Sequence, residues 1–204
     1  MFGVTDYGAF VIAVIVFLAI PGPGNLALVT STGKGGVRGG LAATCGVICG
    51  DQALLWLAVT GLSALLAASP AAFGAVRLGG ALYLGWLGIL MLLAKPGAGP
   101  VLNMKTGDYF GQAFLITLLN PKAILFYMAF FPLFVDTKAF QGVLTFGFMA
   151  FTIACLTLLY GAGVVLLTRY FASTLRAKPW MKTALEKIAG AILLGFALKL
   201  AFNL

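Results

Sequence analysis

Apolar residues fill most of the chain in six long runs, which are separated by short polar stretches. The runs fall at about residues 6–30, 39–67, 73–94, 109–135, 140–168 and 184–203. Each is close to the roughly 20 residues that a helix, rising about 1.5 Å per residue, needs to cross a bilayer core about 30 Å thick. We therefore predict an all-α integral membrane protein, with six transmembrane helices in one domain that spans residues 1–204.

The composition supports a membrane protein and excludes several kinds of chemistry. Hydrophobic residues make up 62% of the chain and charged residues 9%, whereas soluble domains have roughly 45–50% and 25%. Six spans in 204 residues leave no room for a separate soluble catalytic domain. The chain has no His, which excludes His-based acid/base catalysis and His-ligated metal sites. We predict neither an enzyme nor a bound cofactor or metal.

The positive charges predict the orientation in the membrane. The chain has 13 Lys and Arg against 5 Asp and Glu, a net charge of +8, and such residues collect in cytoplasmic loops. The loops after the first, third and fifth runs hold Lys34, Arg38, Lys95, Lys105, Arg169, Arg176, Lys178 and Lys182, against Arg77, Lys138 and Lys199 on the other side. These three loops are therefore predicted to be cytoplasmic and both termini extracytoplasmic. Topology accounts for the charge, so no nucleic-acid partner is predicted.

The two halves of the chain resemble each other in sequence. RLGGALYLG at 77–85 aligns with KIAGAILLG at 187–195, and the Asp-Tyr pair before the first run recurs before the fourth. A proline interrupts each of those two runs. Three helices per half is an odd number, so the second half must enter the membrane from the opposite side. We predict two inverted repeats, about 1–95 and about 106–204, as in secondary transporters that hold substrate near the midplane.

The first candidate site is Pro21-Gly22-Pro23-Gly24-Asn25, about fifteen residues into the first apolar run. Two prolines remove two backbone donors and two glycines ease departure from helical geometry, so the helix is predicted to break here. One interpretation is a kink that serves packing. The other is a discontinuous helix whose second half starts near Asn25 and points its N–H groups at an anion such as a carboxylate.

The second candidate site is Asn120-Pro121-Lys122, in the middle of the fourth run. Lys122 lies about thirteen residues from either end of that run, too deep to reach the interface easily, and a central Lys costs about 2.5–3.5 kcal/mol on insertion scales. One hypothesis is a structural ion pair that locks two helices. The alternative is a cation for a substrate carboxylate, or one member of a proton-coupled pair.

Asp51 is the only carboxylate deep within any apolar run, which makes it the natural counter-charge for Lys122. Gly46 and Gly50, four residues apart, would let another helix approach this stretch closely. Asp51 is either half of a structural pair or a transport residue, acting as proton carrier or ammonium ligand. Tyr160, in the fifth run, is expected to bond a backbone carbonyl rather than a ligand.

Four motifs in order resemble the LysE/RhtB superfamily of bacterial amino-acid exporters along essentially the whole chain. They are PGPGN in the first run, GD in the second, RLGGALYLGWLG in the third and LLNPKAILFYMAFFPLF in the fourth. The leucine-exporter branch is the most similar. The resemblance implies a six-helix inner-membrane exporter of amino acids, driven by the proton gradient and homodimeric. It places the site at both breaks and at Asp51.

The leading functional hypothesis is antiport of protons against neutral, branched aliphatic amino acids. The substrate carboxylate would meet Lys122 or a broken-helix N-terminus, and its ammonium would meet Asp51 or exposed carbonyls. An exporter of lysine or arginine is the alternative within this class, although a cationic substrate would need a second buried acid. A passive channel or a structural membrane subunit also fits the hydropathy. Neither explains two helix breaks beside opposite charges.

Overall fold

The computed structural model describes residues 2–20, 22–68, 104–135 and 142–177, with scattered positions between 75 and 93 and between 184 and 198. The predicted third and sixth helices, which carry the aligned segments of the repeat, lie largely outside the described residues. Within the described part, regular structure is helical, apart from one isolated antiparallel bridge between Val4 and Val135. The prediction of an all-helical protein is confirmed for these residues.

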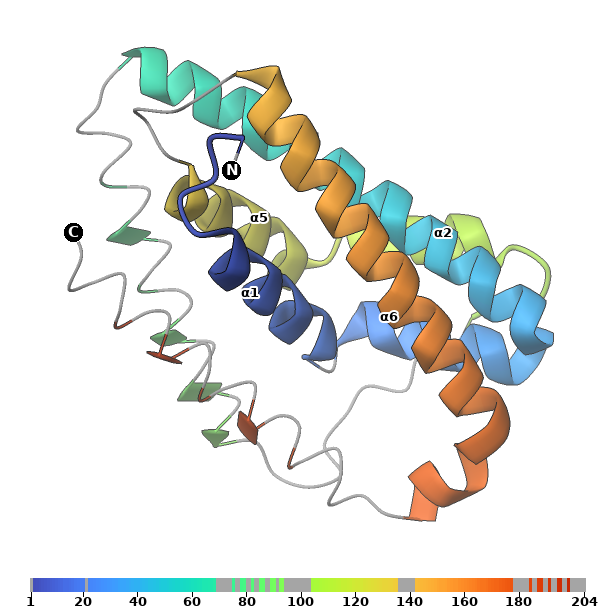
Figure 1. The fold of residues 1–204 in the computed structure, drawn as a ribbon. Helices are drawn as coiled ribbons and strands as arrows, with labels where there is room; N and C mark the ends of the chain where they lie inside the picture. The colour runs from blue at the N-terminus through green and yellow to red at the C-terminus, as the bar shows by residue number, and fades with distance from the viewer. Residues whose placement is uncertain are drawn as a thin grey trace.

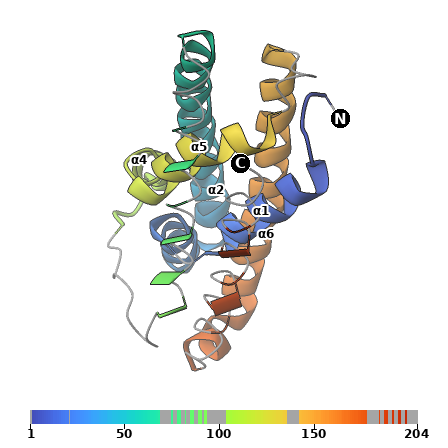
Figure 2. The same cartoon turned by 90° about the vertical axis from the view of Figure 1, so that its left-hand side faces the viewer.

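Two long helices and three short ones make up the described bundle. They are α1 (Tyr7–Ala19), α2 (Pro23–Ala68), α4 (Tyr109–Leu118), α5 (Pro121–Phe134) and α6 (Val143–Ala177). Figures 1 and 2 show α2 and α6 as the long helices, with the short ones packed around them. By length and composition, Pro23–Gly61 of α2, which turns sharply at Gly36, and Val143–Tyr170 of α6 are apolar enough to cross a membrane.

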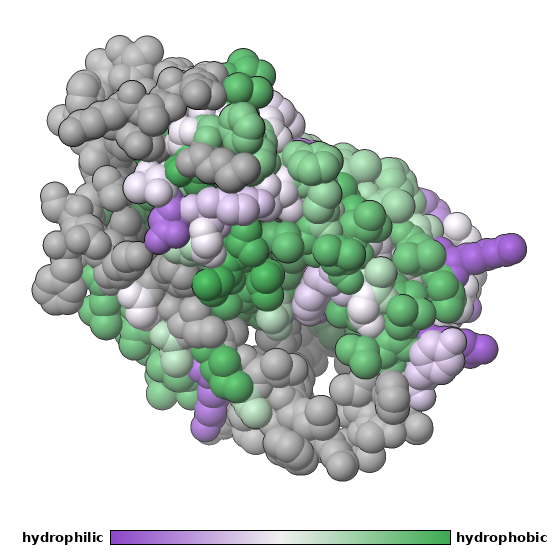
Figure 3. Space-filling view, in the orientation of Figure 1, coloured by the Kyte–Doolittle hydropathy of each residue, from purple (hydrophilic) through white to green (hydrophobic). Residues whose placement is uncertain are grey.

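The outer surface is apolar, as a bilayer requires. Phe151 and Leu159 of α6 are each 70% exposed, and Leu57 of α2 is also exposed. Figure 3 shows hydrophobic residues over much of the visible face. Soluble monomers rarely expose contiguous apolar patches of this kind, whereas lipid tails cover them without cost.

A sharp turn divides α2 into two helical segments. Gly36 has φ 63° and ψ −158°, a conformation that is accessible to glycine but strained for other residues. The loop predicted between the first two apolar runs is therefore reduced to a turn at one residue. The first segment of α2 completes the first run, and the second segment is the second run.

Both predicted helix breaks are present. Helix α1 ends at Ala19 and α2 begins at Pro23, while α4 ends at Leu118 and α5 begins at Pro121. Each proline therefore occupies the start of a helix, where its missing N–H costs no hydrogen bond. The second half of the first broken helix starts at Pro23, two residues before Asn25, which agrees with the expected start near Asn25.

The two Asp-Tyr pairs start equivalent helices. The Asp6 carboxylate accepts from the backbone N–H of Ala9 at 2.9 Å, and the Asp108 carboxylate accepts from that of Gly111 at 2.8 Å. Both are N-caps that satisfy a backbone donor three residues on. The repeated dipeptide in the sequence thus corresponds to one repeated structural role.

The two broken helices run antiparallel. At one end, the start of α1 lies beside the end of α5, because the N–H of Thr5 donates to the carbonyl of Phe134 at 3.0 Å (Figure 1). At the other end, the Tyr109 ring at the start of α4 packs over Gly35 and Gly39, next to the Gly36 turn. The two broken helices therefore cross the bundle in opposite directions, and their breaks lie in the same region.

Glycines bring α4 against α2 just before Asp51. A methyl group added at Gly46 would collide with the carbonyl oxygen of Phe110 and lie 3.0 Å from the backbone nitrogen of Phe114. One added at Gly50 would lie 2.7 Å from Cβ of Thr117. The small-residue stretch therefore packs against a helix of the same chain. This contact holds Asp51 beside the second break.

Candidate functional site

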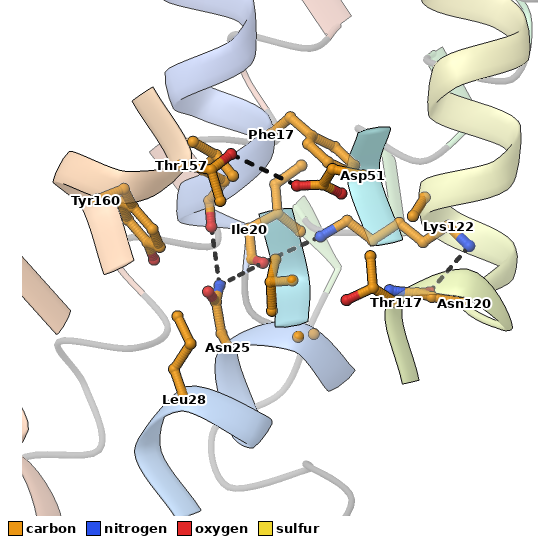
Figure 4. Close-up of a pocket in the computed structure, with 15 residues that line it drawn as sticks. Phe17, Ile20, Asn25, Leu28, Asp51, Thr117, Asn120, Lys122, Thr157 and Tyr160 are labelled. Atoms are coloured by element: carbon orange, nitrogen blue, oxygen red, sulfur yellow. Dashed lines mark hydrogen bonds between the residues drawn. The ribbon is translucent and has the colours of Figure 1, made fainter. Parts of the chain in front are cut away.

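Residues from both helix breaks line one small pocket, to which all five described helices or their flanking residues contribute (Figure 4). Its volume is about 50 Å³. The lining residues are Phe17, Leu18, Ile20, Gly22, Gly24, Asn25, Leu28, Val47, Asp51, Thr117, Asn120, Lys122, Ala123, Thr157 and Tyr160. In the part of the chain that the structure describes, no three metal-ligating side chains gather to hold a metal ion.

Asn25 closes the first break. Its Nδ2 donates to the carbonyls of Leu18 and Ile20, both at 2.9 Å. The last carbonyls of a helix have no partner within it, so an amide that reaches back removes much of the cost of the break. Asn25 therefore serves the C-terminal end of α1, whereas the sequence pointed to an anion site at the start of the next helix.

Lys122 joins the second break to the first. Its Nζ donates to the carbonyl of Ile20 at 3.0 Å and lies 5.0 Å from the centre of the Phe17 ring, within range of a cation–π contact. The carbonyl of Ile20 thus accepts from both Asn25 and Lys122. One backbone oxygen, freed by the proline motif, connects the two broken helices.

Asn120 caps the second half of the second broken helix. Its Oδ1 accepts from the backbone N–H of Lys122 at 3.1 Å, in the usual manner of an N-cap. The two asparagines therefore do opposite jobs. Asn25 satisfies carbonyls at the end of a helix, and Asn120 satisfies a donor at the start of one.

Asp51 is buried at the pocket wall with 3% of its surface exposed. The Thr157 hydroxyl, from α6, donates to its Oδ2 over a long 3.5 Å (Figure 4). The Tyr127 hydroxyl also lies within interaction range of the carboxylate. Asp51 and Lys122 line the same pocket. In the described part of the chain, however, no ion pair joins them within 4.0 Å. The predicted counter-charges therefore share a cavity without direct contact.

Most of the residues predicted from the sequence meet at this pocket. The lining includes Gly22, Gly24, Asn25, Asp51, Asn120 and Lys122. Pro23 and Pro121 are the first residues of α2 and α5, and Pro21 lies outside the described residues.

The sequence missed two polar residues of the wall, Thr117 and Thr157, and it named Tyr160 only as a residue that would bond a backbone carbonyl. Tyr160 lies within interaction range of the Asn25 side chain. A threonine in a transmembrane helix carries no pattern that would mark it, because its hydroxyl usually bonds a carbonyl of its own helix.

Apolar clusters flank the pocket on two sides. Leu28 packs in the cluster that contains Met104, and Phe17 stacks on Phe126 with ring centres 3.6 Å apart. A cavity of about 50 Å³ holds one or two waters, whereas ligand sites usually measure roughly 300–1,000 Å³. The walls must therefore move apart before the pocket can take a ligand of ordinary size.

A polar pocket between two broken helices, inside an apolar shell, is the arrangement typical of secondary membrane transporters. The family model of the LysE type translocators matches residues 15–204, and the chain belongs to this family.

Curated relatives cover almost the full length. The chain is 32% identical to a leucine efflux protein of Salmonella choleraesuis, over 98% of this chain and 96% of the relative. It is 34% identical to a leucine efflux protein of Enterobacter sp. strain 638, over 98% and 97%. An uncharacterised membrane protein of Pseudomonas aeruginosa is 32% identical, over 98% and 96%. No solved structure matches the chain at a significant level.

Proposed function

We propose that this protein exports neutral amino acids of the leucine type across the bacterial inner membrane, in exchange for protons. The observation that carries the proposal is the joint placement of Asp51 and Lys122 in one pocket between two broken helices. Full-length relatives named leucine efflux proteins support the substrate class.

The pocket offers a partner for each part of an amino acid. Lys122 can exchange the Ile20 carbonyl for the substrate carboxylate, because a carboxylate attracts the ammonium with a full negative charge whereas a carbonyl offers only a dipole. Asp51 can accept the ammonium group or carry a proton. Phe17, Leu28 and Val47 supply apolar wall for an aliphatic side chain.

The wall favours a neutral substrate over a cationic one. Asp51 is the only carboxylate among the residues that the structure places around the pocket. A lysine or arginine substrate brings two positive groups, and the second would be buried without a counter-charge, which is costly in a low-dielectric site. Neutral amino acids avoid this cost.

The proposal is tested with everted membrane vesicles, in which export appears as uptake. With an acidic interior, vesicles that contain the protein are expected to concentrate labelled leucine, but not labelled lysine or arginine. Collapse of the gradient with a protonophore should release the accumulated leucine. Vesicles without the protein are the control. Uptake that only equilibrates, with or without a gradient, would indicate a channel and contradict the proposal.

We further propose six helices in two inverted repeats, with both termini extracytoplasmic, and a homodimer as the assembled form. The antiparallel broken helices and the matching N-caps at Asp6 and Asp108 support the repeat. The pocket is lined by residues of one chain, which is compatible with one transport path per subunit.

The topology gives a direct prediction. A C-terminal alkaline phosphatase fusion should be active, because this enzyme needs an extracytoplasmic location, and a C-terminal green fluorescent protein fusion should be dark. The same reporters inserted after Arg176 should show the reverse pattern, since that loop carries much of the positive charge. A fluorescent C-terminal fusion would contradict the proposed orientation or the count of six helices.

A further inference from the structure

Thr117, at the end of α4, has a buried hydroxyl without a partner. The residue is 3% exposed, and its Oγ1 has no hydrogen-bond partner among the described residues. It also lines the pocket, where Figure 4 shows it beside Asn120 and the Lys122 side chain. Buried polar groups in folded proteins are nearly always satisfied, so an exception at a cavity wall indicates a missing partner.

Two other buried threonines in the same bundle, Thr32 and Thr44, are satisfied within their own helices. The hydroxyl of Thr32 donates to the carbonyl of Leu28 at 2.7 Å, and that of Thr44 donates to the carbonyl of Gly40 at 2.9 Å. This bond to the carbonyl four residues back is the usual arrangement for a threonine in a helix. Thr117 departs from it, although it occupies the last turn of a regular helix.

The position of Thr117 is fixed by close packing. Its Cβ lies 2.7 Å from the point where a side chain would begin at Gly50, one residue before Asp51. Any larger residue at Gly50 would force Thr117 or the backbone of α2 to shift. The contact thus holds the Thr117 hydroxyl at the pocket wall. Its neighbour Gly50 directly precedes Asp51, which is the only carboxylate among the lining residues.

We propose that Thr117 is a substrate-binding residue whose hydroxyl donates to the carboxylate of the transported amino acid. This inference rests on the proposed function for the identity of the substrate. Lys122 and Thr117 lie on the same side of the pocket, and Asp51 with Thr157 lies on another (Figure 4). The Lys122 ammonium and the Thr117 hydroxyl then donate to the two oxygens of the substrate carboxylate, while the substrate ammonium faces Asp51.

The arrangement predicts selection for a free carboxylate. A site that is built to hydrogen-bond one group rejects an analogue that lacks it, because buried polar groups are then left unpaired. Leucinamide and leucinol keep the aliphatic side chain and the ammonium of leucine but lack the carboxylate. They should compete with leucine at least tenfold less well in the wild-type protein.

The test measures binding of labelled leucine to purified protein in detergent, with melting temperatures recorded without ligand. Thr117→Val keeps the shape of the side chain and removes the hydroxyl, so leucine affinity should fall at least tenfold, the usual scale for a hydrogen bond to a charged group. Thr117→Ser should bind close to the wild-type level. Thr44→Val is the matched control, since its hydroxyl bonds only its own helix, and it should leave affinity unchanged.

The melting temperature separates binding from structure. Removing an unpaired buried hydroxyl should leave the unliganded protein as stable as before, or more stable. A clear loss of stability in both Thr117→Val and Thr117→Ala would mean that the hydroxyl is structural, and would overturn the inference. Wild-type affinity in a folded Thr117→Val protein would also overturn it. Failure of the wild-type protein to bind any amino acid would instead reject the proposed function.

Discussion

Asp51→Asn is expected to stop proton-driven export while the protein remains folded and inserted. The change removes the only carboxyl group among the described residues that line the pocket, yet it keeps the size of the side chain and much of its hydrogen bonding to Thr157 and Tyr127. Leucine can still bind and move down its own gradient. Accumulation in everted vesicles against a gradient should fall to the background level, whereas exchange of labelled for unlabelled leucine should persist.

Two further variants separate coupling from a structural role. Removing one partner of a buried ion pair costs about 3–5 kcal/mol, so a structural pair predicts loss of membrane abundance in each single variant. The double variant Asp51→Asn, Lys122→Gln would then regain abundance. Under the transport hypothesis it is folded but uncoupled. Proton-driven export at the normal rate in this double variant, at wild-type abundance, would eliminate the coupling role of both residues.

A matched control for the loss of an acid is Asp108→Asn. Asp108 is exposed and caps α4, and Asn is as good an N-cap as Asp, so the helix should start as before. Export by this variant should equal that of the wild type. Equal loss in Asp51→Asn and Asp108→Asn would show that the effect does not depend on the pocket.

Among substitutions that add one methyl group in α2, Gly46→Ala is expected to reduce the stability of the protein most. The added carbon would meet the backbone oxygen of Phe110, and a backbone atom can give way only if the whole of α4 shifts. Overpacking of this kind typically costs about 1–3 kcal/mol. Because α4 carries Thr117 and leads into Asn120 and Lys122, the shift should also widen or distort the pocket. Membrane abundance, melting temperature and leucine export should all decrease.

Gly61→Ala provides the comparison in the same helical segment. Nothing lies within 4 Å of a methyl group at Gly61, and replacing Gly by Ala in a helix is worth about 1 kcal/mol in propensity. This variant should be as stable as the wild type, or more so. Equal stability of the Gly46→Ala and Gly61→Ala proteins would show that α2 and α4 do not pack as closely as the structure indicates.

The helix breaks were predictable because their cause is local. A proline lacks the N–H that a helix interior needs and clashes with the preceding turn, whatever the tertiary structure. Pro23 and Pro121 therefore indicate helix starts from the sequence alone. The deep charges are local in the same sense, since one Asp or Lys within a long apolar run is costly in any membrane fold. The same residues also carried the family resemblance that the family model confirms.

Partners across helices depended on the tertiary structure. Asn25 turns its amide back to α1, Lys122 bonds the carbonyl of Ile20 from 102 positions earlier, and Asp51 stands beside Lys122 without pairing. Such contacts are set by how closely two helices approach, which glycines such as Gly46 decide through shape. Thr117 is the clearest case, because nothing in the sequence distinguishes it from other helical threonines. Only the packing of α4 against α2 places its hydroxyl at the pocket. The chain itself thus determined where helices break and where charge is buried, since both follow from backbone and solvation costs at single positions. Only the packed bundle decided which polar atoms meet, because that depends on distances between segments far apart in sequence.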